Sequence, residues 1–142
     1  MQVSVLLQTK GSEVVTVRPD ETIAAVAVVL AEHRIGAVVV TEDGRSIDGV
    51  LSERDIVRAI AQPGMLDATA ASLMTADVVT CQPDTTVEEL MATMTERRIR
   101  HVPVLVDGSL SGLVSIGDVV KHHIATLEHE TKAMHDYIAH PY

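Results

Sequence analysis

The chain has 142 residues, of which 46% are hydrophobic, enough for one compact domain or for two small halves that share a core. Lys and Arg total 11 against 20 Asp and Glu, for a formal net charge of −9. Binding to a nucleic-acid backbone needs clustered positive charge, so this balance argues against DNA or RNA as the main partner. An acidic chain can still bind one small anion in a local basic pocket.

The cysteine content and the distribution of apolar residues exclude further classes of protein. Cys81 is the only cysteine, which rules out an intrachain disulfide and a zinc site built from several cysteines. Residues 1–12 lack the basic flank and apolar stretch of a signal peptide, and no apolar run reaches membrane-spanning length. We therefore expect a cytoplasmic protein that makes no contact with membranes.

In chain order, the first predicted elements lie between residues 14 and 61. An apolar run over residues 14–17 predicts a strand that ends at a Pro-Asp turn. Thr22 is placed to N-cap a helix whose apolar residues recur at helical spacing. Two apolar runs, 37–41 and 48–51, predict a β-hairpin with an Asp-Gly turn, and Ser52 is placed to begin a second helix.

The same order of elements returns after a connector rich in Ala and Thr, in which we expect one or two helical turns. Residues 78–81 predict a strand, and Thr86 N-caps a helix. Glu89 completes a capping box there, which the first helix lacks. A hairpin is predicted over residues 102–114, and Ser115 is placed to begin the next helix.

These two segments are copies of one unit. VVTVRPDETI, which starts at Val14, matches VVTCQPDTTV, which starts at Val78. After the loss of one residue, GVLS at 49–52 meets GLVS at 112–115. The predicted divisions are a first repeat with its N-terminal segment (1–61), a connector (62–77), a second repeat (78–121) and a C-terminal helix (122–142).

The C-terminal helix carries apolar residues spaced alternately four and three apart, a heptad-like pattern with one polar member. The row consists of Val120, Ile124, Leu127, Thr131, Met134 and Ile138. Two interpretations stay open: the row packs on the protein's own sheet, or it contacts a second subunit or a target protein.

The repeat and its motifs resemble the cystathionine-β-synthase (CBS) domain pair. The matching motifs are GVLSERD at 49–55, RIRHVPV at 98–104 and GLVSIGD at 112–118. The resemblance implies an α/β fold of two β-α-β-β-α repeats packed about a pseudo-two-fold axis, followed here by a C-terminal helix. It also implies two related clefts and a non-catalytic regulatory module that binds an adenosine-containing ligand such as AMP, ADP, ATP, an NAD-type molecule or an S-adenosyl compound.

The resemblance also implies the site residues. In family members with this motif, an Asp accepts hydrogen bonds from both ribose hydroxyls, which suits its two carboxylate oxygens, and a Ser near a helix N-terminus faces the phosphate. One implied cleft contains Asp118, Ser115, His101, Val14, Val15, Ile35, Gly36 and Ala37. The other contains Asp55, Ser52, Val78, Val79, Ile99 and Arg100.

The two clefts differ in sequence, so we expect unequal affinities. His101 in the second repeat corresponds to Ala37 in the first, and Arg100 corresponds to Gly36. We hypothesise that the Asp118 cleft is the better site for a 5′-monophosphate.

Structural interpretations of the same residues stay open. Both Ser-x-x-Asp motifs are also capping boxes. His101 can be a structural histidine whose ring nitrogens form hydrogen bonds at the end of a strand. Arg97, Arg98 and Arg100 can interact favourably with the carbonyl groups at the C-terminus of a helix.

Catalytic groups and a metal site are not predicted. No nucleophile constellation stands out, and Cys81 is expected to pack as a small apolar residue. The histidines of the last helix are not spaced as a zinc pair. We expect AMP or ATP as ligand, with Mg²⁺ only beside a polyphosphate, and a homodimer or a protein target as partner. The alternative function is a ligand-independent homodimerisation scaffold that acts through the C-terminal helix.

Overall fold

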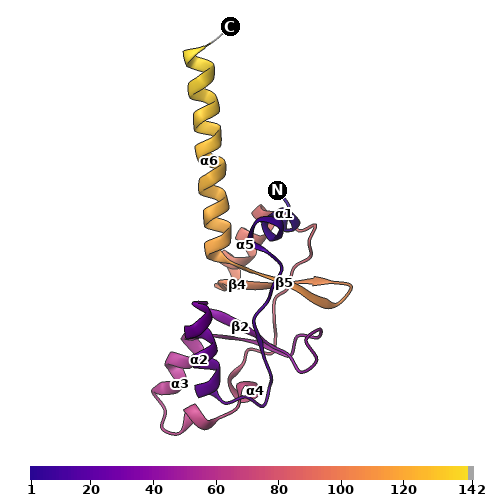
Figure 1. Cartoon of the computed structure of the whole chain (residues 1–142), viewed down its shortest axis with the longest axis vertical. Helices are drawn as coiled ribbons and strands as arrows, with labels where there is room; N and C mark the ends of the chain where they lie inside the picture. The colour runs from indigo at the N-terminus through magenta and orange to yellow at the C-terminus, as the bar shows by residue number, and fades with distance from the viewer. Residues whose placement is uncertain (141–142) are drawn as a thin grey trace.

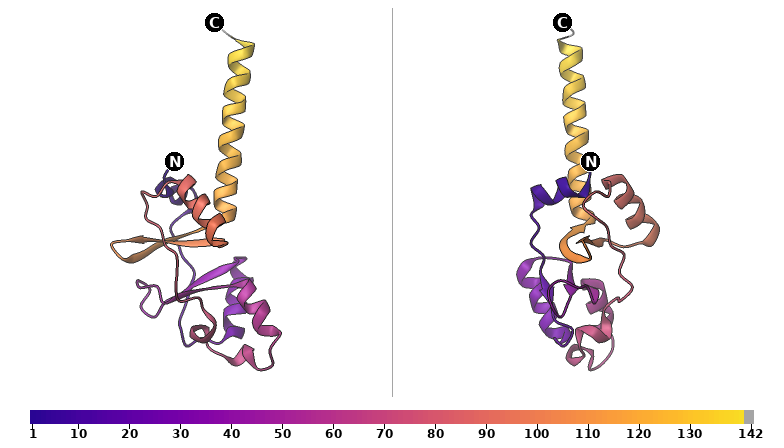
Figure 2. Two further views of the ribbon diagram at one scale, coloured as in Figure 1. Left: turned by 180° about the vertical axis from the view of Figure 1, so that it is seen from behind. Right: turned by 90° about the vertical axis from the view of Figure 1, so that its right-hand side faces the viewer.

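A computed structural model of the chain describes residues 1–140 and confirms the predicted α/β fold (Figure 1). The last two residues of the predicted C-terminal helix lie outside the described residues. Each repeat places helices against one small sheet, and the two sheets lie next to each other in the middle of the molecule (Figures 1 and 2).

The first repeat is a three-stranded sheet covered by two helices. Its strands are β1 (Thr16–Val17), β2 (Ala37–Val40) and β3 (Gly49–Ser52); β1 runs parallel to β2, and β2 runs antiparallel to β3. The helices are α2 (Ile23–His33) and α3 (Glu53–Ile60). All four residues of β2 are buried, because one face of this strand carries the helices and the other faces the second repeat.

The second repeat has the same plan with a smaller sheet. Helix α5 (Val87–Arg97) precedes the antiparallel pair β4 (His101–Val106) and β5 (Ser109–Ser115). The strand predicted over 78–81 is reduced to one parallel bridge, between Cys81 and Val104. Pro103 explains the shortening: it has no N–H, so the ladder that Cys81 begins cannot extend back toward Val79.

The short helix that precedes each repeat packs on the other repeat. In α1 (Val3–Lys10), Val3 and Leu6 are buried in the core of the second repeat, and α1 and α5 both contact α6. The connector contains a 3-10 turn (Met65–Asp67) and α4 (Ala70–Leu73), and Ala70 is buried in the core of the first repeat. The N-terminal segment therefore packs mainly with the second repeat, although the sequence assigned it to the first.

Helix α6 (Ile116–Ala139) runs without a break through the boundary predicted at residue 121. Neither Gly nor Pro occurs between Asp118 and Ala139 to end it. Its counterpart α3 stops at Ile60, shortly before the Pro63-Gly64 turn. Beyond its first turns α6 projects away from the body (Figure 2), so of the two open interpretations, packing of the apolar row on the protein's own sheet is wrong.

Candidate functional site

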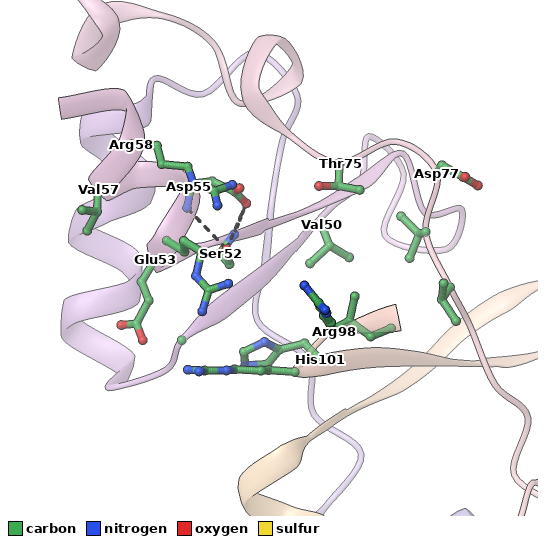
Figure 3. A pocket seen from close by; sticks show the side chains of 16 residues that line it. Val50, Ser52, Glu53, Asp55, Val57, Arg58, Thr75, Asp77, Arg98 and His101 are labelled. Atoms are coloured by element: carbon green, nitrogen blue, oxygen red, sulfur yellow. Dashed lines mark hydrogen bonds between the residues drawn. The ribbon is translucent and has the colours of Figure 1, made fainter. Parts of the chain in front are cut away.

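A cavity of about 540 Å³ lies between the two repeats. Figure 3 shows its walls: β3 and the start of α3 on one side, and the residues around Thr75, Arg98 and His101 on the other. The lining residues are Gly36, Val50, Ser52, Glu53, Arg54, Asp55, Val57, Arg58, Thr75, Asp77, Val78, Val79, Arg98, Ile99, Arg100 and His101.

Ser52 and Asp55 form the polar end of the cavity. Ser52 leaves β3 in an extended conformation and N-caps α3, which orients Asp55 one turn later. Oδ2 of Asp55 accepts hydrogen bonds from the N–H of Ser52 at 2.9 Å and from its Oγ at 3.0 Å. Within residues 1–140 no hydrogen bond reaches Oδ1 of Asp55, so this oxygen can accept one from a ligand.

Asp118 repeats this arrangement at the start of α6 but has a further partner. Its Oδ2 accepts hydrogen bonds from the N–H of Ser115 at 2.8 Å and from Oγ at 2.9 Å. Lys10, at the end of α1, places Nζ 2.6 Å from the same oxygen and donates to the carbonyl of Leu113 at 2.6 Å. Burial raises the pKa of the Asp118 carboxyl, but the hydrogen bonds from Lys10 and Ser115 and the charge of Lys10 outweigh it, so that the pKa lies below its ordinary value.

The cavity concentrates basic groups in an otherwise acidic chain. The side chains of Arg54, Arg58, Arg98 and Arg100 all line it. Glu53, Asp55 and Asp77 lie in the same walls, so the positive charge is partly balanced. Guanidinium groups bind phosphate oxygens through paired N–H donors, and this cavity can therefore receive an anionic group without being strongly charged when empty.

His101 lies where the two repeats meet. Its imidazole packs over Gly36: a Cβ on Gly36 would lie 3.4 Å from both Cε1 and Nε2 of the ring. Burial and the nearby charge of Lys10 lower the pKa of His101, while the carboxylates of Glu53 and Asp118 oppose the shift. The lowered pKa favours the neutral form of the imidazole at pH 7.

Residues 9–62 and 70–124 each match the family model of the CBS domain. The chain belongs to the CBS-domain family. The mitochondrial CBS domain-containing protein CBSX3 of Arabidopsis thaliana is 34% identical over 125 residues, which are 84% of this chain and 61% of the plant protein. This chain thus spans less than two thirds of that relative.

Solved CBS structures share the architecture over most of this chain. A CBS-domain protein from Agrobacterium tumefaciens is 46% identical, with a TM-score of 0.83 over 87% of this chain and 99% of its own. The CBS domain pair of protein MJ0100, solved with 5′-methylthioadenosine and S-adenosyl-L-methionine, is 24% identical and has the same fold, with a TM-score of 0.80 over 89% of this chain and 98% of its own.

The CBS pair brings together every residue that the sequence assigned to the Asp55 cleft. Ser52, Asp55, Val78, Val79, Ile99 and Arg100 all line the cavity. Gly36 and His101, which the sequence assigned to the Asp118 cleft, line the same cavity. The other residues of the predicted Asp118 cleft do not: Asp118, Ser115, Val14, Val15, Ile35 and Ala37. Ala37 is fully buried, and Ile35 borders a separate, shallower hollow against α2 and α3.

The sequence reasoning did not assign several charged residues of the site, among them Glu53, Arg54, Arg58 and Arg98 in the cavity walls and the two residues that follow. Lys10 contacts Asp118, and Asp77 lines the Asp55 cavity. A signal existed: Leu6-Leu7 echo Leu73-Met74, and the same register places Lys10 opposite Asp77. The surroundings of Asp55 and Asp118 in this CBS pair therefore differ by a reversal of charge at one position.

Neither a metal site nor a membrane helix is found in the described part of the chain. Among residues 1–140, no group of three or more His, Cys, Asp or Glu side chains is arranged to hold a metal ion. No helix in this range is both long and apolar enough to cross a membrane.

Proposed function

We propose that this CBS pair is a non-catalytic regulatory module that binds an adenosine-containing nucleotide in the Asp55 cleft. The observation that carries the proposal is the free Oδ1 of Asp55 at the end of an open cavity, opposed by a basic wall and flanked by apolar side chains. A volume of about 540 Å³ lies within the usual range for small-molecule sites. The adenosine derivatives bound by the MJ0100 pair support the ligand class.

Each part of the nucleotide has a counterpart in the cavity. The adenine ring packs against Val78, Val79 and Ile99, which supply the apolar wall. The ribose hydroxyls donate to Asp55, and the phosphate lies at the N-terminus of α3, near Ser52. We expect AMP or ATP; the surrounding arginines favour a polyphosphate, which would bring Mg²⁺ with it.

This proposal reverses the ranking hypothesised from the sequence. Lys10 already donates to Oδ2 of Asp118 and competes with a ribose for this carboxylate, and Asp118 is absent from the walls of the cavity. Asp55 has no such competitor among the described residues. We therefore place the stronger site at Asp55 and a weaker one at Asp118.

The regulatory step follows from the position of the cleft. A ligand that touches α3 and the start of β4 joins the two repeats and stabilises one relative arrangement of them. It changes the equilibrium of a homodimer or a protein target only if it binds the two arrangements unequally. We place this function in the cytoplasm.

A second candidate function is a ligand-independent scaffold that dimerises through α6. The exposed apolar row of that helix favours it: Ile124, Leu127, Met134 and Ile138 are between 50% and 68% exposed.

Calorimetric titration tests the proposal. AMP, ADP, ATP, NAD and S-adenosylmethionine are each titrated into the protein and into Asp55→Ala and Asp118→Ala. The two variants lose the same capping interaction, so Asp118→Ala controls for helix capping. Loss of the ribose hydrogen bonds costs about 1.5–3 kcal/mol, so Asp55→Ala is expected to bind at least about tenfold more weakly and Asp118→Ala nearly normally. If none of the five ligands gives binding heat with folded protein, the result would instead support the ligand-independent scaffold function.

A further inference from the structure

Helix α6 carries an apolar row that nothing in the described chain covers. Ile124, Leu127, Met134 and Ile138 are exposed, and Thr131 is the one polar member of the row. Ile124, Leu127 and Thr131 line a shallow groove along the helix. Alternate spacing of four and three residues is the pattern by which one helix packs along another.

The row faces away from the body of the protein. In heptad notation, Ile124, Thr131 and Ile138 are a positions, and the other members of the row are d positions. The α6 residues that are buried or half-buried are Asp118, Val119 and His122. They occupy the b, c and f positions, on the side opposite to a and d, so the row is open to a second helix from its base to its tip.

The glutamates and histidines beside the row favour a parallel partner. In a parallel pair of α6 helices, each g residue meets the e residue five positions later on the partner. His123 then lies opposite Glu128 of the second copy, and Glu130 opposite His135. The antiparallel register that buries the whole row instead sets Glu128 against Glu128 and Glu130 against Glu130, which is repulsive.

The polar member of the row agrees with this orientation. Thr131 meets Thr131 of the second copy in the parallel arrangement, and each hydroxyl can donate to the carbonyl of Leu127 on its own helix, at 2.8 Å, which satisfies it within the interface. In the antiparallel register it meets Leu127. A polar residue at a single a position is a known way of fixing the register of a coiled coil.

We propose that α6 pairs with α6 of a second copy of this chain as a parallel two-stranded coiled coil, with both bodies at the same end. This specifies the geometry of the scaffold function and does not depend on nucleotide binding.

Sedimentation equilibrium of the full chain tests the pairing. Leu127→Glu places a charge in the row, and Ala125→Glu places the same charge on the same helix at a b position. Leu127 is half exposed, so its substitution leaves the core intact. We expect a dimer that Leu127→Glu weakens at least tenfold and Ala125→Glu leaves unchanged. A wild-type monomer at high concentration, or a dimer that tolerates Leu127→Glu, overturns the proposal.

Disulfide formation tests the orientation. Ile138→Cys is oxidised alone, Val120→Cys is oxidised alone, and the two variants are then oxidised as a mixture. A parallel pair gives a linked homodimer with each single variant. An antiparallel pair gives linkage only between the two different variants, and that result overturns the parallel arrangement. The unmodified chain, which has Cys81 alone, is the control.

Discussion

The ammonium group of Lys10 lies 2.6 Å from the carboxylate of Asp118, across the junction between α1 and the second repeat. Asp55 occupies the equivalent capping box in the first repeat and has no lysine beside it among residues 1–140. The side chains of Lys10 and Asp118 are only 35% and 24% exposed, so this ion pair is less screened than a surface pair. This contact adds to the sequence differences between two halves that arose by internal duplication.

The first prediction concerns the number of binding sites. Lys10→Met removes the ammonium group and keeps most of the aliphatic stem, so Asp118 becomes free to accept hydrogen bonds from a ribose. We expect calorimetry with AMP or ATP to show a second site in Lys10→Met that is weak or silent in the wild type.

Two controls isolate this effect. Lys132→Met makes the same change on the exposed part of α6 and is expected to leave the stoichiometry unchanged. Adding Asp118→Ala to Lys10→Met is expected to remove the new site. An unaltered single site in Lys10→Met would mean that Lys10 does not compete with a ligand.

The second prediction concerns stability in acid. The pKa of Asp118 is lowered below its ordinary value of 3.8, so at low pH the unfolded chain binds this proton more readily than the folded chain does. The stabilisation is therefore complete above the unfolded pKa and is lost as pH falls through the folded pKa. Thermal melts of wild type and Asp118→Asn should differ most at neutral pH and converge once the pH falls below the folded pKa of Asp118. Asp136→Asn, on the exposed part of α6, should show no pH-dependent difference in melting temperature from the wild type.

The sequence predicted local structure better than contacts between the repeats. The caps at Thr22 and Thr86, and the capping boxes at Ser52 and Ser115, are present as predicted. Each of them depends on a hydrogen bond between residues three apart, so a short window of sequence contains both partners.

Contacts over long distances in the chain were not predictable in this way. Lys10 reaches Asp118, and Val3 packs in the core of the second repeat, because the leading helices are exchanged between the repeats. His101 and Gly36 line the Asp55 cavity because they meet at the junction of the two repeats. None of these pairings leaves a periodic pattern in the sequence, and only the echo of Leu6-Leu7 in Leu73-Met74 pointed toward the exchange.

The third prediction concerns proton uptake on binding. The pKa of His101 is lowered below its ordinary value of 6.5, chiefly by burial, and a phosphate placed beside the ring would raise it again. Binding is then coupled to proton uptake at pH values between the free and bound pKa, so affinity should rise as pH falls from 8 toward 6. Calorimetry in two buffers with different ionisation enthalpies measures the protons taken up.

The matched variants for this prediction are His101→Asn and His33→Asn. His101→Asn should abolish the proton uptake, whereas His33→Asn should preserve it, because His33 lies on α2 and is absent from the cavity walls. Equal proton uptake in both variants would show that His101 does not contact the phosphate.

The fourth prediction concerns the packing of the exchanged segments. A Cβ on Gly49 would lie 2.6 Å from Sδ of Met74 and 2.9 Å from the backbone oxygen of Thr75. A Cβ on Gly112, the equivalent position, would lie 2.9 Å from the end of the Leu7 side chain. A side-chain tip can rotate away, but a backbone oxygen held by the Val50–Thr75 bridge cannot. Gly49→Ala should therefore destabilise the protein by about 1–3 kcal/mol and Gly112→Ala by less. Urea denaturation of the two variants measures the difference, and equal losses would mean that the connector gives way as easily as the Leu7 side chain.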